Sequence, residues 1–129
     1  MLSSNELQDF KDRLEKRFYE LREIIRLELI NTEQQSYIEL AGKIHDIEEQ
    51  SVADLLVDLN LADIDRHVDE IRDIDAALMR IAQRSYGICS DCGQDVDKKR
   101  LLAEPTASRC HACQQRHEQN YIQAPHASL

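Results

Sequence analysis

Four cysteines are the residues of this chain best suited to chemistry. Cys89-Ser-Asp-Cys92 and Cys110-His-Ala-Cys113 form two C-x-x-C pairs separated by seventeen residues. This spacing is typical of zinc sites, in which two tight turns each supply two thiolates to one tetrahedral ion. Because four thiolates leave no coordination position open for catalysis, we predict one structural Zn²⁺ per chain, held by Cys89, Cys92, Cys110 and Cys113.

Other roles for these cysteines are disfavoured by their setting. The N-terminal residues 1–16 become charged too early for a signal peptide, so we expect a cytoplasmic protein whose thiols stay reduced. A thioredoxin-type redox role would need a βαβ context, which the sequence lacks. The chain also shows no Ser/His/Asp grouping and no phosphate-cradling glycine loop, so we do not expect an enzyme.

The elements that position this site are predicted to be helices. The chain has 129 residues, with 32% charged residues, three glycines and two prolines, a composition that suits long helices better than sheets. Two runs place apolar residues at steps of three or four, as on one face of a helix. The first run is Leu7, Phe10, Leu14, Phe18, Leu21, Ile25 and Leu29, and the second is Val52, Leu55, Leu59, Ile64, Val68, Ile71, Leu78 and Ile81.

A chain reversal near residues 44–45 brings these two runs together. Phe18 then faces Ile71, and Ile25 faces Ile64, as in an antiparallel coiled coil. We therefore predict an all-α fold: a long antiparallel coiled-coil helical hairpin, then a small four-cysteine zinc finger and a short C-terminal helix. The expected parts are the hairpin at 1–84 with its tip at about 39–50, the finger with its helix at 85–124, and a disordered tail at 125–129.

One polar stretch leaves an alternative to the continuous hairpin. Residues 31–36 carry no apolar side chain, yet in this register they face residues 53–58. Either the first helix breaks there and forms a shorter bundle, or a partner covers Leu55 and Leu56. We expect a monomer, with a dimer through Leu55 and Leu56 as the alternative.

The charge disfavours two classes of partner. The net charge is −9, and residues 1–84 hold 11 basic against 20 acidic residues, so a phosphate backbone would repel the hairpin. We therefore expect no direct DNA binding. No stretch approaches the roughly 18 apolar residues of a membrane span, so we expect no membrane partner.

The finger sequence resembles the DksA/TraR zinc-finger family. The similarity lies in Tyr86-Gly87-x-Cys89-x-x-Cys92-Gly93 and in the run from Arg100 through Ala103, Pro105 and Ala107 to Cys113. It extends more loosely over the hairpin. The resemblance implies a transcription regulator that binds bacterial RNA polymerase, inserts its hairpin through the secondary channel and modulates promoter complexes at initiation.

The resemblance also implies which residues meet the partner. The well-studied members carry an Asp-x-x-Asp-x-Ala tip, which is absent here, and the residues expected at the tip are His45, Asp46, Glu48 and Glu49. Apart from the resemblance, a set of basic residues clusters by sequence around the finger junction, and we expect it to bind the partner: Arg80, Arg84, Lys98, Lys99 and Arg100.

One departure from the family concerns the alarmone ppGpp. Family members bind it partly through a basic residue just before the finger's proline, and here that residue is Glu104. A carboxylate would repel a polyphosphate, so we do not expect ppGpp binding of the family's kind.

A different class of function remains open from the sequence. The same hairpin and finger could serve as a zinc-finger coiled-coil scaffold or adaptor that binds another protein through the hairpin. A slim monomeric acidic end favours channel insertion, whereas a dimer along the second helix would block it.

Overall fold

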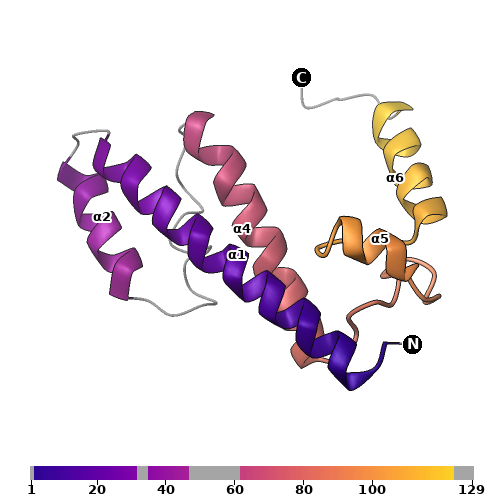
Figure 1. The fold of residues 1–129 in the computed structure, drawn as a ribbon. Helices are drawn as coiled ribbons and strands as arrows, with labels where there is room; N and C mark the ends of the chain where they lie inside the picture. Colours follow the sequence, from indigo (N-terminus) through magenta and orange to yellow (C-terminus); the bar gives the residue numbers. More distant parts are fainter. Residues whose placement is uncertain (1, 32–34, 47–61, 124–129) are drawn as a thin grey trace.

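The computed structural model describes residues 2–31, 35–46 and 62–123, which are mostly helical. The helices are α1 (Ser4–Asn31), α2 (Gln35–Asp46), α4 (Ala62–Ala82), α5 (Lys98–Ala103) and α6 (His111–Gln123) (Figure 1). Within these residues the β pairing is limited to an isolated antiparallel bridge between Ile88 and Asp95. The all-α prediction is confirmed. None of the described helices is long and apolar enough to cross a membrane.

Helix α1 starts with a reciprocal cap. The amide of Glu6 donates to Ser3 Oγ (3.1 Å), and the amide of Ser3 donates to Glu6 Oε1 (3.0 Å). This is a capping box, which satisfies two amides that the first helical turn would otherwise leave unpaired. Leu2 and Leu7 occupy the staple positions on either side of it, and both pack against the core. The cap therefore fixes where α1 begins.

Helices α1 and α4 run antiparallel and bury the predicted apolar faces against each other (Figure 1). The side chains of α1 in this interface are at most 4% exposed: Phe10, Leu14, Phe18, Leu21, Ile25 and Leu29. On α4 the buried apolar side chains are Ile64, Val68, Ile71, Ile74 and Ala77. A bidentate ion pair of Arg17 with Glu70 (2.6 and 3.0 Å) bridges the two helices one residue from the expected pairing of Phe18 with Ile71. The helical hairpin is thus confirmed.

The first helix is shorter than a continuous hairpin requires. It ends at Asn31, and α2 packs along α1 rather than extending it (Figure 1). Ala41 of α2 is only 1% exposed, and Tyr37 and Leu40 pack on the same core. The polar stretch that begins at Asn31 supplies no apolar contact to hold a straight helix, whereas these three side chains find cover on α1.

Part of the predicted hairpin cannot be compared with the structure. The expected pairings that involve Val52 and Leu59, and the uncovered Leu55 and Leu56, lie outside the described residues. The tail at 125–129 lies outside them as well.

Helix α4 ends in a Schellman cap that carries an arginine. The amide of Ser85 donates to the carbonyl of Arg80 (2.8 Å), and the amide of Arg84 donates to the carbonyl of Ile81 (3.2 Å). Arg84 has φ 63°, the left-handed conformation in which this cap usually places glycine. The cap turns the chain from α4 into the finger.

Candidate metal centre and its junction with the hairpin

Two short backbone turns hold the four cysteines together. In the first turn the amide of Gly93 donates to the carbonyl of Cys89 (3.0 Å), and Gly93 has a positive φ (75°), which glycine adopts without strain. In the second turn Cys110 directly precedes α6, and Cys113 lies in the helix's first turn. The amide of Ser90 donates to the carbonyl of Ser108 (2.8 Å), which ties the two turns to each other.

The sulfur positions match a tetrahedral zinc site. All four Sγ atoms lie within 4.8 Å of one another, and those of Cys92 and Cys110 are 3.8 Å apart. A Zn–S bond of about 2.3 Å gives a sulfur–sulfur edge of roughly 3.8 Å in a regular tetrahedron. Cys89 and Cys113 are buried and Cys92 is exposed. The donor set and the spacing fit one structural Zn²⁺, as predicted.

The electrostatics of the four thiols also favour a divalent cation. Burial opposes ionisation of Cys89, but hydrogen bonds from the amides of Cys110, Cys92 and Asp91 outweigh it and lower its pKa to about 6. Hydrogen bonding to Cys110 and then burial raise the pKa of Cys113 to about 12. Without a cation the four groups cannot all be thiolates, whereas a bound metal stabilises all four negative charges.

The finger has a small core of its own that continues into the hairpin. Its buried apolar residues besides the cysteines are Tyr86, Val96, Leu101 and Ala107. The Tyr86 ring lies 5.6 Å from that of Phe10 in α1, and its hydroxyl donates to the carbonyl of Pro105 (2.7 Å). Burial raises the pKa of Tyr86 to about 12, so this hydroxyl stays a donor.

Polar contacts fix the finger to the base of the hairpin. Arg13 of α1 donates to the carbonyl of Leu102 (2.7 Å), and Lys98 forms an ion pair with Glu6 of the α1 cap. The hydrogen bond with Lys98, together with the Ser3 contacts, lowers the pKa of Glu6 to about 2. One carboxylate thus caps α1 and also contacts the first residue of α5.

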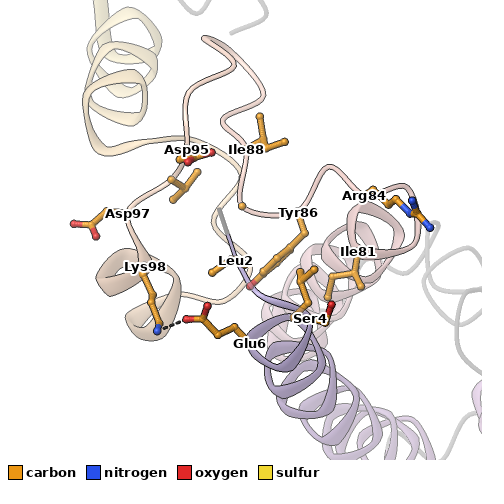
Figure 2. A pocket seen from close by; sticks show the side chains of 13 residues that line it. Leu2, Ser4, Glu6, Ile81, Arg84, Tyr86, Ile88, Asp95, Asp97 and Lys98 are labelled. Carbon is orange, nitrogen blue, oxygen red and sulfur yellow. Dashed lines mark ion pairs between the residues drawn. The ribbon is translucent and has the colours of Figure 1, made fainter.

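A cavity of about 1070 Å³ lies at this junction (Figure 2). Its apolar lining comes from three parts of the chain: Leu2 and Leu7 at the start of α1, Ile81 at the end of α4, and Tyr86, Ile88 and Val96 in the finger. The charged lining residues are Glu6, Arg84, Asp95, Asp97 and Lys98. Leu2 lies so close to Gly87 that a Cβ added at Gly87 would be 3.1 Å from Leu2 Cδ1.

The five predicted partner-binding cations fall into two groups. Arg80 is half-buried and donates to the carbonyl of Thr106 (3.1 Å), Arg100 donates to the carbonyl of Arg109 (2.9 Å), and Lys98 is paired with Glu6. These three hold the finger together or attach it to the hairpin. Arg84 and Lys99 are exposed. Binding of a partner by all five remains a prediction.

The structure does not extend α2 beyond the far end of the α1–α4 stalk, because α2 runs back along α1 and its last residues, His45 and Asp46, lie beside α1 (Figure 1). His45 and Asp46 form the end of α2, but their side chains, and Glu48 and Glu49 entirely, lie outside the described residues. Their role at a partner's active site remains a prediction.

Three residues with structural roles in the junction and the finger were not predicted from the sequence. Ser3 and Glu6 spell the S-x-x-E signal of a capping box, so they could have been found. Arg116, which donates to Cys113 Sγ (3.1 Å), gave no comparable signal.

Known proteins share both the finger and the fold. Residues 84–119 match the prokaryotic dksA/traR C4-type zinc finger family. The RNA polymerase-binding transcription factor DksA of Caulobacter vibrioides (strain NA1000 / CB15N) is 42% identical over 60 residues, 46% of this chain and 42% of that protein. DksA of Escherichia coli (strain K12) is 34% identical over 55 residues, 43% of this chain and 36% of that protein. The chain thus matches less than half the length of these relatives.

A solved structure extends the likeness beyond the finger. The structure of transcription factor DksA2 from Pseudomonas aeruginosa superposes with a TM-score of 0.65 at 25% identity, covering 94% of this chain and 89% of that one. The likeness to this structure is one of fold, and it covers the helical hairpin as well as the finger region. Residues 84–119 belong to the DksA/TraR C4-type zinc-finger family, so the family recognised from the sequence is confirmed.

Proposed function

We propose that this protein binds bacterial RNA polymerase and regulates transcription in the cytoplasm without binding DNA. The observation that carries the proposal is a DksA/TraR zinc finger fixed to the base of an antiparallel helical hairpin, in a fold shared with DksA2 over 94% of the chain. The DksA relatives from Caulobacter vibrioides and Escherichia coli are named RNA polymerase-binding transcription factors.

The proposed mode of binding is insertion of the hairpin through the secondary channel. Helices α1 and α4 form the stalk, and the finger stands at its base, where Tyr86, Arg13 and Arg80 hold it. The strongly acidic hairpin suits a site that contains Mg²⁺ and basic residues, since a carboxylate arriving there could pair with a cation or compete for it. Asp46, Glu48 and Glu49 are the carboxylates we assign to that role.

The surroundings of Glu104 support the expectation that ppGpp is not a ligand of the family's kind. Glu104 is exposed. Burial, then the charge of Asp69, and also that of Glu104 raise the pKa of Asp73. Arg80, whose charge lowers the pKa of Asp73, is the cation beside them, and Glu104 still places a negative charge where the family has a basic residue, which disfavours a polyphosphate.

Transcription in vitro with purified polymerase tests this mechanism. Asp46→Ala should abolish the effect on promoter complexes while binding stays near that of the wild type, because the stalk and finger supply most of the contact. Glu118→Ala, which removes an exposed carboxylate of α6, is the matched control and should change neither. Equal loss of binding and activity in Asp46→Ala would make the tip an anchor, and full activity would remove the tip mechanism.

A further inference from the structure

Arg84 occupies a backbone position where glycine is the usual residue. It is the one non-glycine residue with positive φ among those described, and its amide makes one of the two hydrogen bonds of the α4 cap. In this conformation a side chain's Cβ crowds the backbone, a strain that glycine avoids. The fold itself would therefore favour glycine at residue 84.

The Arg84 side chain makes no polar contact that would hold the described part of the fold. It is exposed, and its guanidinium makes no ion pair or hydrogen bond with the residues that the structure describes. The neighbouring cations differ, because Lys98 pairs with Glu6 and Arg80 donates to Thr106. A residue with a strained backbone, whose charge pairs with no other described residue, is typical of a site that contacts a partner.

The surroundings of Arg84 suggest what it contacts. Arg84 lies at the edge of the junction cavity, with its guanidinium turned away from the other lining side chains (Figure 2). The same cavity exposes apolar surface, including 41% of Ile88. Asp95 and Asp97 line the opposite side of the cavity (Figure 2), so a ligand carboxylate is favoured only at the edge that carries Arg84, with an apolar neighbour turned toward the cavity.

We propose that Arg84 and the junction cavity form a second contact with RNA polymerase, which receives an acidic segment of the polymerase. A carboxylate of that segment pairs with Arg84, and an adjacent apolar side chain enters the cavity beside Ile88. The inference rests on the proposed function. The hairpin, with 20 acidic against 11 basic residues over 1–84, repels such a segment, so the contact also fixes how the protein is oriented on its partner.

Substitution by glycine separates folding from binding at this position. Arg84→Gly should raise the melting temperature, because it relieves the left-handed backbone, yet weaken binding to purified polymerase by roughly fivefold, as for loss of one exposed ion pair. Arg84→Asn removes the charge with a residue that tolerates this backbone better than arginine, so it should weaken binding equally. Arg84→Lys keeps the charge and should bind within about twofold of the wild type, because an exposed pair depends mainly on charge. Ile88→Ala, which trims the apolar side, should also weaken binding.

Three results would overturn the inference. If the wild type binds polymerase and all four variants bind equally well, the junction is not a contact and the proposed function stands. If Arg84→Lys binds as weakly as Arg84→Gly, the charge is not the recognised feature. If Arg84→Gly changes self-association in sedimentation and leaves polymerase binding unchanged, the surface joins copies of this chain. Failure of the wild type itself to bind would refute the proposed function and this inference with it.

Discussion

Cys92 is the most exposed of the four cysteines of the metal site. Cys92→Ser should lose the zinc and unfold the finger, because its few buried apolar residues cannot hold it without the metal. The hairpin should stay helical, since the interface of α1 with α4 does not involve the cysteines. Elemental analysis should give one zinc per wild-type chain and circular dichroism should show the helix. Wild-type protein that contains no zinc when freshly purified and reduced would contradict the assignment.

The ion pair of Arg17 with Glu70 permits a second test at the scale of residues. Both side chains are about 40% exposed, so Glu70→Gln should lower the free energy of unfolding by only about 0.5–1 kcal/mol at neutral pH. The hydrogen bonds from Arg17 lower the pKa of Glu70 below its usual value of 4.5.

This direction of shift fixes the pH dependence of the pair. A carboxylate whose pKa is depressed in the folded state stabilises the fold above pH 4.5 and loses that contribution as the pH falls through its folded-state pKa. The difference between wild type and Glu70→Gln in urea unfolding should therefore be largest near pH 7 and shrink below pH 4.5. A difference that grows on acidification would exclude the pair as its source.

At the scale of elements, periodicity predicted α1 and α4 but not the course of α2. Leu14, Phe18 and Ile71 recur at helical spacing, and the structure buries all three. Tyr37, Leu40 and Ala41 share one helix face whether the helix continues or folds back, so the pattern could not distinguish the two arrangements. The polar stretch at residues 31–36 was the only signal of the break.

Packing of α2 on α1 gives a prediction for two adjacent residues. Ala41 is 1% exposed, so Ala41→Leu should overpack the contact and cost about 1–3 kcal/mol of stability. Gly42 is exposed and a Cβ there would meet nothing within 4 Å, so Gly42→Ala should stabilise by roughly 0.5–1 kcal/mol. Thermal unfolding followed by circular dichroism measures both. Tolerance of leucine at residue 41 would mean that α2 does not pack on α1 in solution.

The contacts between elements were the least predictable from sequence. The spacing of the four cysteines was enough to predict the metal site, because tetrahedral zinc coordination restricts the spacing of its ligands. The contact of Glu6 with Lys98 joins residues far apart in the chain, and neither residue type nor spacing indicates it. The left-handed backbone of Arg84 could not be predicted from the sequence either, because such a helix cap is usually recognised by a glycine.

At the scale of the whole molecule, the finger and the hairpin act as one unit joined at the base. The acidic residues concentrate in residues 1–84, whereas the finger part, 85–129, has five basic and five acidic residues. The contacts of Glu6, Arg13 and Tyr86 hold the finger beside the start of α1, away from the other end of the hairpin (Figure 1). The two ends of the molecule can therefore contact different parts of one partner.

The most direct test of the proposed function is binding of the zinc-loaded protein to purified bacterial RNA polymerase, measured by native mass spectrometry or biolayer interferometry. We expect a complex of one chain with one polymerase that forms without DNA. We also expect binding to be lost in Cys92→Ser, because the finger is then unfolded. Absence of a complex at micromolar polymerase, or binding that requires DNA, would contradict the proposed function.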